Sequence, residues 1–241
     1  MKPILFNTEM VRAILDGRKT VTRRVVRFPD GMTGRLSSSG MRDHLFYPCG
    51  IKRPPYHPGD ILYVRETWNY GYCDTTDFEY RYNETFFEEL PPGEKDTYLM
   101  PRYFYRTEDL GGIVGMKWRP SIHMPKEAAR LFLRVTEVRA ERLQEITEDG
   151  AIAEGVPDDG PMNPVYCPHC KGERLVEIHD PATLGHVTID CPYCKDAVER
   201  YKNLWNSTVK KSDRPRYGWA ANPWVWVIEF DQISKDEAML E

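Results

Sequence analysis

Two pairs of cysteines carry the clearest chemical signal in the sequence. Each pair has the spacing C-x2-C, and 20 residues separate Cys167-Pro-His-Cys170 from Cys191-Pro-Tyr-Cys194. A tetrahedral zinc ion binds four thiolates at about 2.3 Å, and each C-x2-C turn supplies two of them while the intervening chain folds back. The pattern therefore predicts one structural zinc ion. A catalytic zinc is not expected, because four cysteines leave no position for water.

Two disulfide bonds are the alternative explanation for these four cysteines, and the reducing cytosol argues against them. His169, His179 and His186 are spare candidate ligands that a full set of four cysteines does not need. Cys49 and Cys73 have no C-x2-C partner, so they are interpreted as ordinary thiols.

The bulk composition is that of an ordinary soluble globular protein. The chain has 241 residues, of which 41% are hydrophobic and 29% charged, and its net charge is −4. That length allows one core with a small appended module. No window approaches the roughly 20 consecutive apolar residues of a membrane helix, and the N-terminus lacks the apolar stretch of a signal peptide. We therefore expect a cytoplasmic location and no membrane partner.

Charge is distributed unevenly along the chain. Residues 1–65 hold 12 Lys and Arg against 5 Asp and Glu, whereas residues 66–115 hold 4 against 11. Either these are two solvated surfaces of opposite sign, or the N-terminal part faces an anion such as a phosphate backbone. On charge alone, the first explanation is favoured.

Several short helices and strands must position any catalytic or binding residues. A helix is expected from about residue 8, because Asn7 or Thr8 can cap it, an apolar stripe follows, and Gly17 suits the position after its end. A second, from Glu148 to Glu154, is followed by Gly155. A third is indicated by apolar residues at helical spacing over residues 198–208. Alternating or β-branched runs predict strands at 21–26, 61–65, 131–136 and 224–230.

Residues 14–24 and several later segments resemble a known domain family. The stretch Ile14-Leu15-Asp16-Gly17-Arg18-Lys19-Thr20-Val21-Thr22-Arg23-Arg24 resembles the opening signature of ASCH domains, which are small β-barrels of the PUA-like superfamily. Further matches follow in the family's order at residues 58–68, 128–138, 147–156 and 224–230. The phrases at 118–125 and 219–224 resemble a phage and prophage branch of that family. The matching segments cover about half of the chain.

The resemblance implies a catalytic site. Small bacterial members of the family include an amidohydrolase that removes the acetyl group of N4-acetylcytidine, and Lys19, Thr22 and Glu154 occupy the places of its catalytic residues. Amide hydrolysis needs a nucleophile, a base that activates it and an acid that protonates the departing amine. A partly buried lysine with a lowered pKa can act as the base. The assignment is therefore Lys19 as base, Thr22 as nucleophile and Glu154 as acid.

Seven further residues in the matching phrases are candidate substrate-binding residues: Arg24, Glu66, Trp68, Arg119, Ser121, His123 and Asn222. Trp68 is a candidate to stack on a base, and Arg24 or Arg119 to contact a phosphate. Core packing explains Trp68 at least as well, and His123 fits a hydrogen-bonded structural residue better than a catalyst.

Together these observations predict an α+β protein, namely a PUA-like mixed β-barrel with flanking helices and an inserted zinc ribbon that has four cysteine ligands. Residues 1–156 form the first part of the barrel, with insertions at about 28–58 and 69–117. Residues 157–195 form the zinc ribbon, residues 196–233 complete the barrel, and residues 234–241 are a tail.

The expected function is that of an amidohydrolase acting on an N-acylated pyrimidine nucleoside or base such as N4-acetylcytidine. An RNA or modified-DNA binding module and a ribonuclease are the alternatives, because basic and hydroxyl side chains around a groove could support either. The expected partner is accordingly a nucleoside or a nucleic acid, RNA in the first instance. Structural Zn2+ is the expected cofactor.

Overall fold

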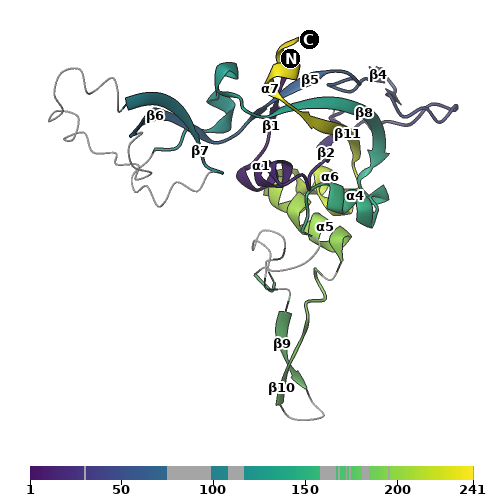
Figure 1. Ribbon diagram of the computed structural model, residues 1–241. Coiled ribbons are helices and arrows are strands. Elements are labelled where there is room, and N and C mark those ends of the chain that lie inside the picture. The colour runs from purple at the N-terminus through teal and green to yellow at the C-terminus, as the bar shows by residue number, and fades with distance from the viewer. Residues whose placement is uncertain are drawn as a thin grey trace. The chain divides into compact units, whose positions relative to one another are not determined.

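Figure 1 shows the computed structural model. By the contacts within it, the chain divides into two compact units. The structure describes residues 1–29, 31–74, 99–107, 117–157, 167, 169–171, 173, 175–180, 185–194 and 196–240. The first unit comprises Met1–Arg12, Ile61–Leu133 and Ile233–Glu241, and the second comprises Ala13–Asp60 and Arg134–Gln232. Helices and strands occur together, which confirms the α+β prediction at this coarse level.

The first unit is built on a parallel strand pair. Strand β1 (Lys2–Leu5) pairs with β5 (Ile61–Arg65), and Val64 N donates to Leu131 O at 3.0 Å. Strands β6 (Trp68–Asp74) and β7 (Leu99–Tyr105) form an antiparallel hairpin. The 3-10 turns η1 (Ser121–His123) and η2 (Lys126–Ala128) follow, and helix α7 (Lys235–Leu240) ends the chain. Apolar side chains from these elements form one buried cluster.

The second unit centres on three strands in the order β8-β11-β2. They are β8 (Phe132–Arg142), β11 (Trp224–Ile233) and β2 (Val21–Val25), and the first two residues of β8 and the last of β11 belong to the other unit. β11 runs antiparallel to β2, with Val227 opposite Arg23. The central strand β11 is a nearly continuous apolar run because both of its faces are covered: the neighbouring residues Val227 and Ile228, which point to opposite faces, are both fully buried.

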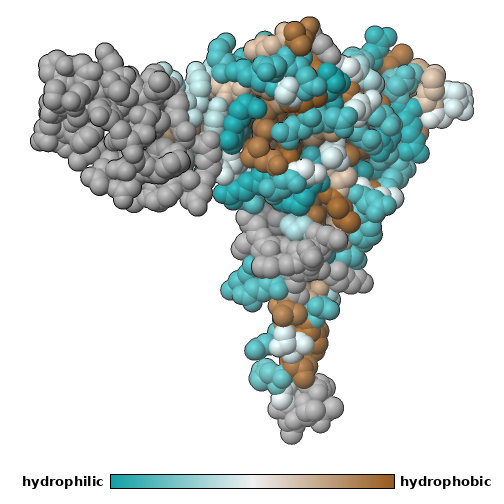
Figure 2. All heavy atoms as spheres, viewed as in Figure 1, coloured by the Kyte–Doolittle hydropathy of each residue, from teal (hydrophilic) through white to brown (hydrophobic). Residues whose placement is uncertain are grey.

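Helices and two hairpins complete the elements. The helices are α1 (Thr8–Leu15), which crosses the unit boundary, α4 (Glu148–Ala153), α5 (Ala197–Thr208) and α6 (Arg214–Tyr217), with 3-10 turns η3 (Leu143–Glu145), η4 (Lys211–Asp213) and η5 (Trp219–Ala221). The hairpins are β3 (Leu45–Tyr47) with β4 (Gly50–Lys52), and β9 (Leu175–Asp180) with β10 (Gly185–Asp190). Figure 2 shows hydrophobic side chains on the surface of the β9–β10 hairpin, where Ile178 is 42% exposed.

Most expected elements are confirmed, and four differ. Strand β8 continues from the predicted end at residue 136 to Arg142, and Val138 and Ala140 in this extension are still buried. The predicted loop at 28–58 contains the β3–β4 hairpin. The predicted tail contains α7, which Ser234 and Glu237 cap reciprocally. Strand β1 was not predicted, since four residues with a proline carry little periodicity.

Two parts of the fold prediction remain predictions. The pairings within each unit form open ladders, and in the described part of the chain none of them closes a barrel. The domain limits are likewise untested, and much of the insertion at 69–117, including residues 75–98 and 108–116, lies outside the described residues. None of the described helices combines the length and apolar character needed to span a membrane.

Candidate active site and metal centre

Lys19 lies in the loop between α1 and β2, as predicted. Gly17, with a φ of 72°, ends the helix, and the backbone N–H groups of Arg18 and Lys19 both donate to Ala13 O at 2.9 Å. Lys19 forms an isolated bridge with Glu154, and Thr20 N donates to Ala153 O at 2.9 Å. These bonds hold the loop against the C-terminal end of α4.

The Lys19 ammonium is buried and uses all three of its donors. Nζ donates to Val21 O at 2.7 Å, to Glu154 O at 2.9 Å and to Glu154 Oε2 at 2.7 Å. The Lys19 side chain is 0% exposed and the Glu154 side chain 3% exposed. Burial lowers the pKa of Lys19 from its usual 10.5, and Arg24 and Arg23 lower it further, while Glu154 opposes the shift.

Glu154 reaches this position because α4 ends there. Thr147 Oγ1 caps the start of the helix by accepting from Gly150 N at 3.1 Å. Gly155 follows with a φ of 86°, and a Cβ at this position would lie 2.7 Å from Ala13 Cβ and 3.0 Å from Lys19 Cβ. Only glycine combines that backbone conformation with the close packing that brings Glu154 onto Lys19.

The second carboxylate oxygen of Glu154 has two further partners. Arg23 Nη1 and the Tyr201 hydroxyl each donate to Oε1 at 3.3 Å. Burial raises the pKa of Tyr201 well above its usual value, and the charge of Glu154 contributes in the same direction. Neither residue was among the predicted site residues. Arg23 lies within the stretch that resembles the ASCH signature but was assigned no role there, and the helical spacing of Tyr201 is typical of a core residue.

Thr22 is not joined to this pair. It is buried in β2 opposite Ile228, and strand alternation directs its side chain away from the face that Arg23 occupies. Among the described residues, no hydrogen bond links Thr22 Oγ1 to Lys19 or Glu154. The structure thus brings together two of the three predicted catalytic residues, and the contact of Lys19 with Val21 O places its ammonium beside the peptide that leads into Thr22.

Two predicted substrate-binding residues lie in the second unit. Burial lowers the pKa of Arg24, with Glu154 acting in the opposite direction. Asn222 adopts a left-handed conformation with a φ of 45°, and its Oδ1 accepts from Gln144 N at 2.9 Å. Asn222 therefore has a clear structural role in a turn, and its contact with a substrate stays a prediction.

The other five candidates lie in the first unit. Glu66 is buried and accepts from Arg130 Nε at 3.0 Å and from Thr107 Oγ1 at 2.9 Å. Trp68 belongs to the buried apolar cluster, which supports the core-packing explanation, and the Arg119 guanidinium lies 5.1 Å from its ring centroid. Ser121 and His123 lie on η1, where His123 is exposed. Their roles in substrate binding stay predictions.

The four cysteines converge as predicted. Their sulfur atoms lie within 4.8 Å of one another, and all four residues are buried. The Sγ–Sγ distance is 3.7 Å from Cys167 to Cys191 and 3.5 Å from Cys170 to Cys194. These values are far above the roughly 2.05 Å of a disulfide and close to the edge, about 3.8 Å, of a tetrahedron of sulfurs around zinc. The cluster can hold a metal ion such as zinc.

The cysteine cluster is connected to the helix that contacts Glu154. Arg200 Nη1 of α5 donates to Cys194 O at 3.3 Å, and Ala197 N at the start of α5 donates to Glu148 Oε2 of α4 at 2.9 Å. Tyr201 follows Arg200 directly. The segment that carries Cys194 is therefore bonded to the N-terminal part of the helix that supplies Tyr201. Within the described residues, the spare histidines are not part of the converging ligand group.

Comparisons with family models, with curated proteins and with solved structures found no match to this chain. The resemblance to ASCH domains therefore rests on the segments quoted above.

Proposed function

We propose that the protein is an amidohydrolase acting on an N-acylated pyrimidine nucleoside or base such as N4-acetylcytidine. The observation that carries this proposal is the buried contact of 2.7 Å between Lys19 Nζ and Glu154 Oε2. The resemblance of residues 14–24 to the ASCH signature supports it, because the same lysine, with Thr22 and Glu154, occupies the family's catalytic places.

One internal proton transfer converts this pair into the base and acid that amide hydrolysis needs. The contacts are those of an ammonium and a carboxylate, and moving one proton along the 2.7 Å hydrogen bond gives an amine and a carboxylic acid. Burial disfavours charged groups, and the lowered pKa of Lys19 reflects this. The neutral pair has the same total number of protons, so neither partner must exchange with solvent first.

The first half of the reaction forms an acyl ester on Thr22. The Lys19 amine takes the proton of Thr22 Oγ1 as that oxygen bonds to the acyl carbon. Glu154 then donates its proton to the pyrimidine nitrogen as the C–N bond breaks, which releases the free amine. Thr22 must approach Lys19 when substrate binds, as catalytic hydrogen bonds often tighten only in the complex.

The second half restores the starting state. Water attacks the ester carbon, and the Glu154 carboxylate takes one proton from it. The bond from the acyl carbon to Thr22 Oγ1 breaks, and the Lys19 ammonium returns a proton to that oxygen. One carboxylic acid leaves, and the amine and carboxylic acid of the site are regenerated. Throughout, Arg23 and Tyr201 hold Glu154 Oε1, so that Oε2 keeps facing Lys19.

A comparison of two substrates tests this proposal against its alternatives. The purified protein is incubated with N4-acetylcytidine and, separately, with RNA, and the products are separated by chromatography. We expect the wild type to release cytidine and a Thr22→Val variant to release none. Cleaved RNA strands without cytidine would point to a ribonuclease instead, and bound but intact RNA without cytidine would point to a binding module.

We further propose that the metal held by the four cysteines is a structural zinc ion. Four thiolates satisfy its tetrahedral preference and leave no open position for substrate. Burial raises the pKa of the Cys191 thiol. A bound cation has the opposite effect, because it favours the thiolate form.

A further inference from the structure

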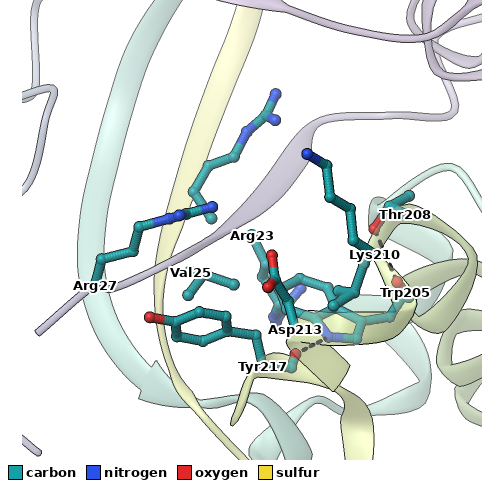
Figure 3. A pocket seen from close by; sticks show the side chains of 10 residues that line it. Arg23, Val25, Arg27, Trp205, Thr208, Lys210, Asp213 and Tyr217 are labelled. Atoms are coloured by element: carbon teal, nitrogen blue, oxygen red, sulfur yellow. Dashed lines mark hydrogen bonds between the residues drawn. The ribbon is translucent and has the colours of Figure 1, made fainter. Parts of the chain in front are cut away.

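A cationic pocket lies beside Arg23 in the second unit. Its volume is about 490 Å3, which is within the size range of small-molecule sites. Arg24 and Arg27 line it from β2 and the segment after it, while Lys210, Asp213 and Tyr217 line it from the chain after α5. Figure 3 shows Arg27 and Lys210 extending from different sides of this pocket.

In the part of the chain that the structure describes, four cationic side chains line the pocket, and one of them, Arg23, is already paired with Glu154 and Glu141. Asp213 is the sole acidic residue among the described side chains that line it. Arg27 and Lys210 take part in none of the ion pairs that the structure describes, and Arg27 lies over the Tyr217 ring at 5.5 Å from its centroid. An excess of positive charge in a concave site attracts an anion.

The aromatic residues Trp205 and Tyr217 also line this pocket. Trp205 Nε1 donates to Tyr217 O at 2.8 Å, which fixes the two residues relative to each other. The dashed line between them in Figure 3 marks this bond. Because Trp205 is buried and Arg27 lies over the Tyr217 ring, the pocket presents guanidinium groups, which bind phosphate oxygens.

Arg23 joins this pocket to the Lys19–Glu154 pair. It lines the pocket, and its Nη1 also lies 3.3 Å from Glu154 Oε1. Arg23 is thus shared between the pocket and the contact with Glu154. A phosphate placed there would bring the adjoining nucleoside towards Glu154.

We infer that this pocket binds a phosphate group of the substrate, so that the acylated pyrimidine is part of a nucleotide or an RNA rather than a free nucleoside. The inference rests on the proposed amidohydrolase function. A mononucleotide and a polymer present the same phosphate chemistry to Arg27 and Lys210. The length of the ligand distinguishes these two sources.

Binding measurements without turnover test the inference. Isothermal titration compares cytidine, cytidine 5′-monophosphate and a short oligocytidylate as ligands of the intact protein. The monophosphate should bind at least ~10-fold more tightly than cytidine, because a hydrogen bond to a charged group contributes about 1.5–3 kcal/mol. A further gain with the oligonucleotide identifies the polymer as the ligand, and equal affinity identifies the mononucleotide.

Matched variants locate the binding. Arg27→Gln and Lys210→Gln should each weaken binding of the monophosphate about 10-fold, whereas Arg35→Gln and Lys211→Gln, which lie outside the pocket, should leave it unchanged. Equal thermal midpoints show that all four variants fold. Equal affinity for cytidine and its monophosphate, or loss of affinity in the controls alone, overturns the inference.

The two proposals fail in different ways. If the monophosphate binds through Arg27 and Lys210 but no acyl group is hydrolysed, the pocket stands and the amidohydrolase proposal fails. If free N4-acetylcytidine is hydrolysed and phosphate gives no gain in affinity, the function stands and the inference about the pocket fails.

Discussion

Replacing Lys19 by methionine should destabilise the folded protein by about 3 kcal/mol. The change removes three donors from a fully buried site, so the carbonyls of Val21 and Glu154 and the Glu154 carboxylate all lose a partner. Each buried polar group left unpaired costs about 1–3 kcal/mol, and breaking a buried ion pair from one side costs about 3–5 kcal/mol in total.

Two effects place the expected cost at the lower end of that range. The Glu154 carboxylate keeps its contacts with Arg23 and Tyr201 after the substitution. The wild type also bears the cost of burying the Lys19 ammonium, as the lowered pKa indicates, and methionine removes that cost. For a chain of this size, 1 kcal/mol shifts the melting temperature by roughly 2–4 °C. The midpoint should therefore fall by roughly 6–12 °C.

A double-mutant cycle measures the interaction itself. Urea unfolding is followed for the wild type, Lys19→Met, Glu154→Leu and the double variant, with Lys126→Met as the control at an exposed lysine. The double variant should lose less free energy of unfolding than the two single variants together, because the second substitution removes a charge that the first left unpaired. Additive costs, or a Lys19→Met variant as stable as the control, would refute the buried-pair account.

Three other perturbations have defined outcomes. Because the pKa of Lys19 is lowered in the folded state, the unfolded chain binds more protons between that pKa and the usual 10.5. The free energy of unfolding should therefore rise with pH in this window, more for the wild type than for Lys19→Met, in thermal melts. Elemental analysis should find one zinc per chain, and Cys170→Ser should lose that metal while circular dichroism still shows folded strands; a protein without metal would contradict the cluster's role. Gly155→Ala should cost about 1–3 kcal/mol in urea unfolding, because its φ is 86° and the new Cβ would lie 2.7 Å from Ala13 Cβ; wild-type stability would show that the loop adjusts freely.

The parts of the site that the sequence predicts are those in which spacing determines geometry. A C-x2-C turn places two sulfurs together by local backbone geometry alone, so Cys167, Cys170, Cys191 and Cys194 were predicted without any fold. Likewise, Gly17 and Gly155 mark the ends of α1 and α4 because the chain needs positive φ at both positions.

The rest of the site depends on contacts between distant segments. Nothing in local spacing pairs Lys19 with Glu154, and only the family resemblance suggested it. The contact of Tyr201 with Glu154 was missed because a tyrosine on the apolar stripe of a helix looks like core. The cationic pocket was missed for a similar reason, since Arg27 and Lys210 come from segments that the fold alone brings together. Of the elements, β1 was missed because it is four residues long and its pairing with β5, about 60 residues later, leaves no local pattern.

The central claim is that Glu154 acts as the acid in deacylation, and one rate comparison tests it most directly. Initial rates of cytidine release from N4-acetylcytidine are measured for the wild type, for Glu154→Gln and for Glu137→Gln, whose side chain is 55% exposed on β8. Removing the acid should lower the rate by about 10²–10⁴-fold, while the surface control keeps the wild-type rate. A Glu154→Gln protein that releases cytidine as fast as the control would contradict the proposed mechanism.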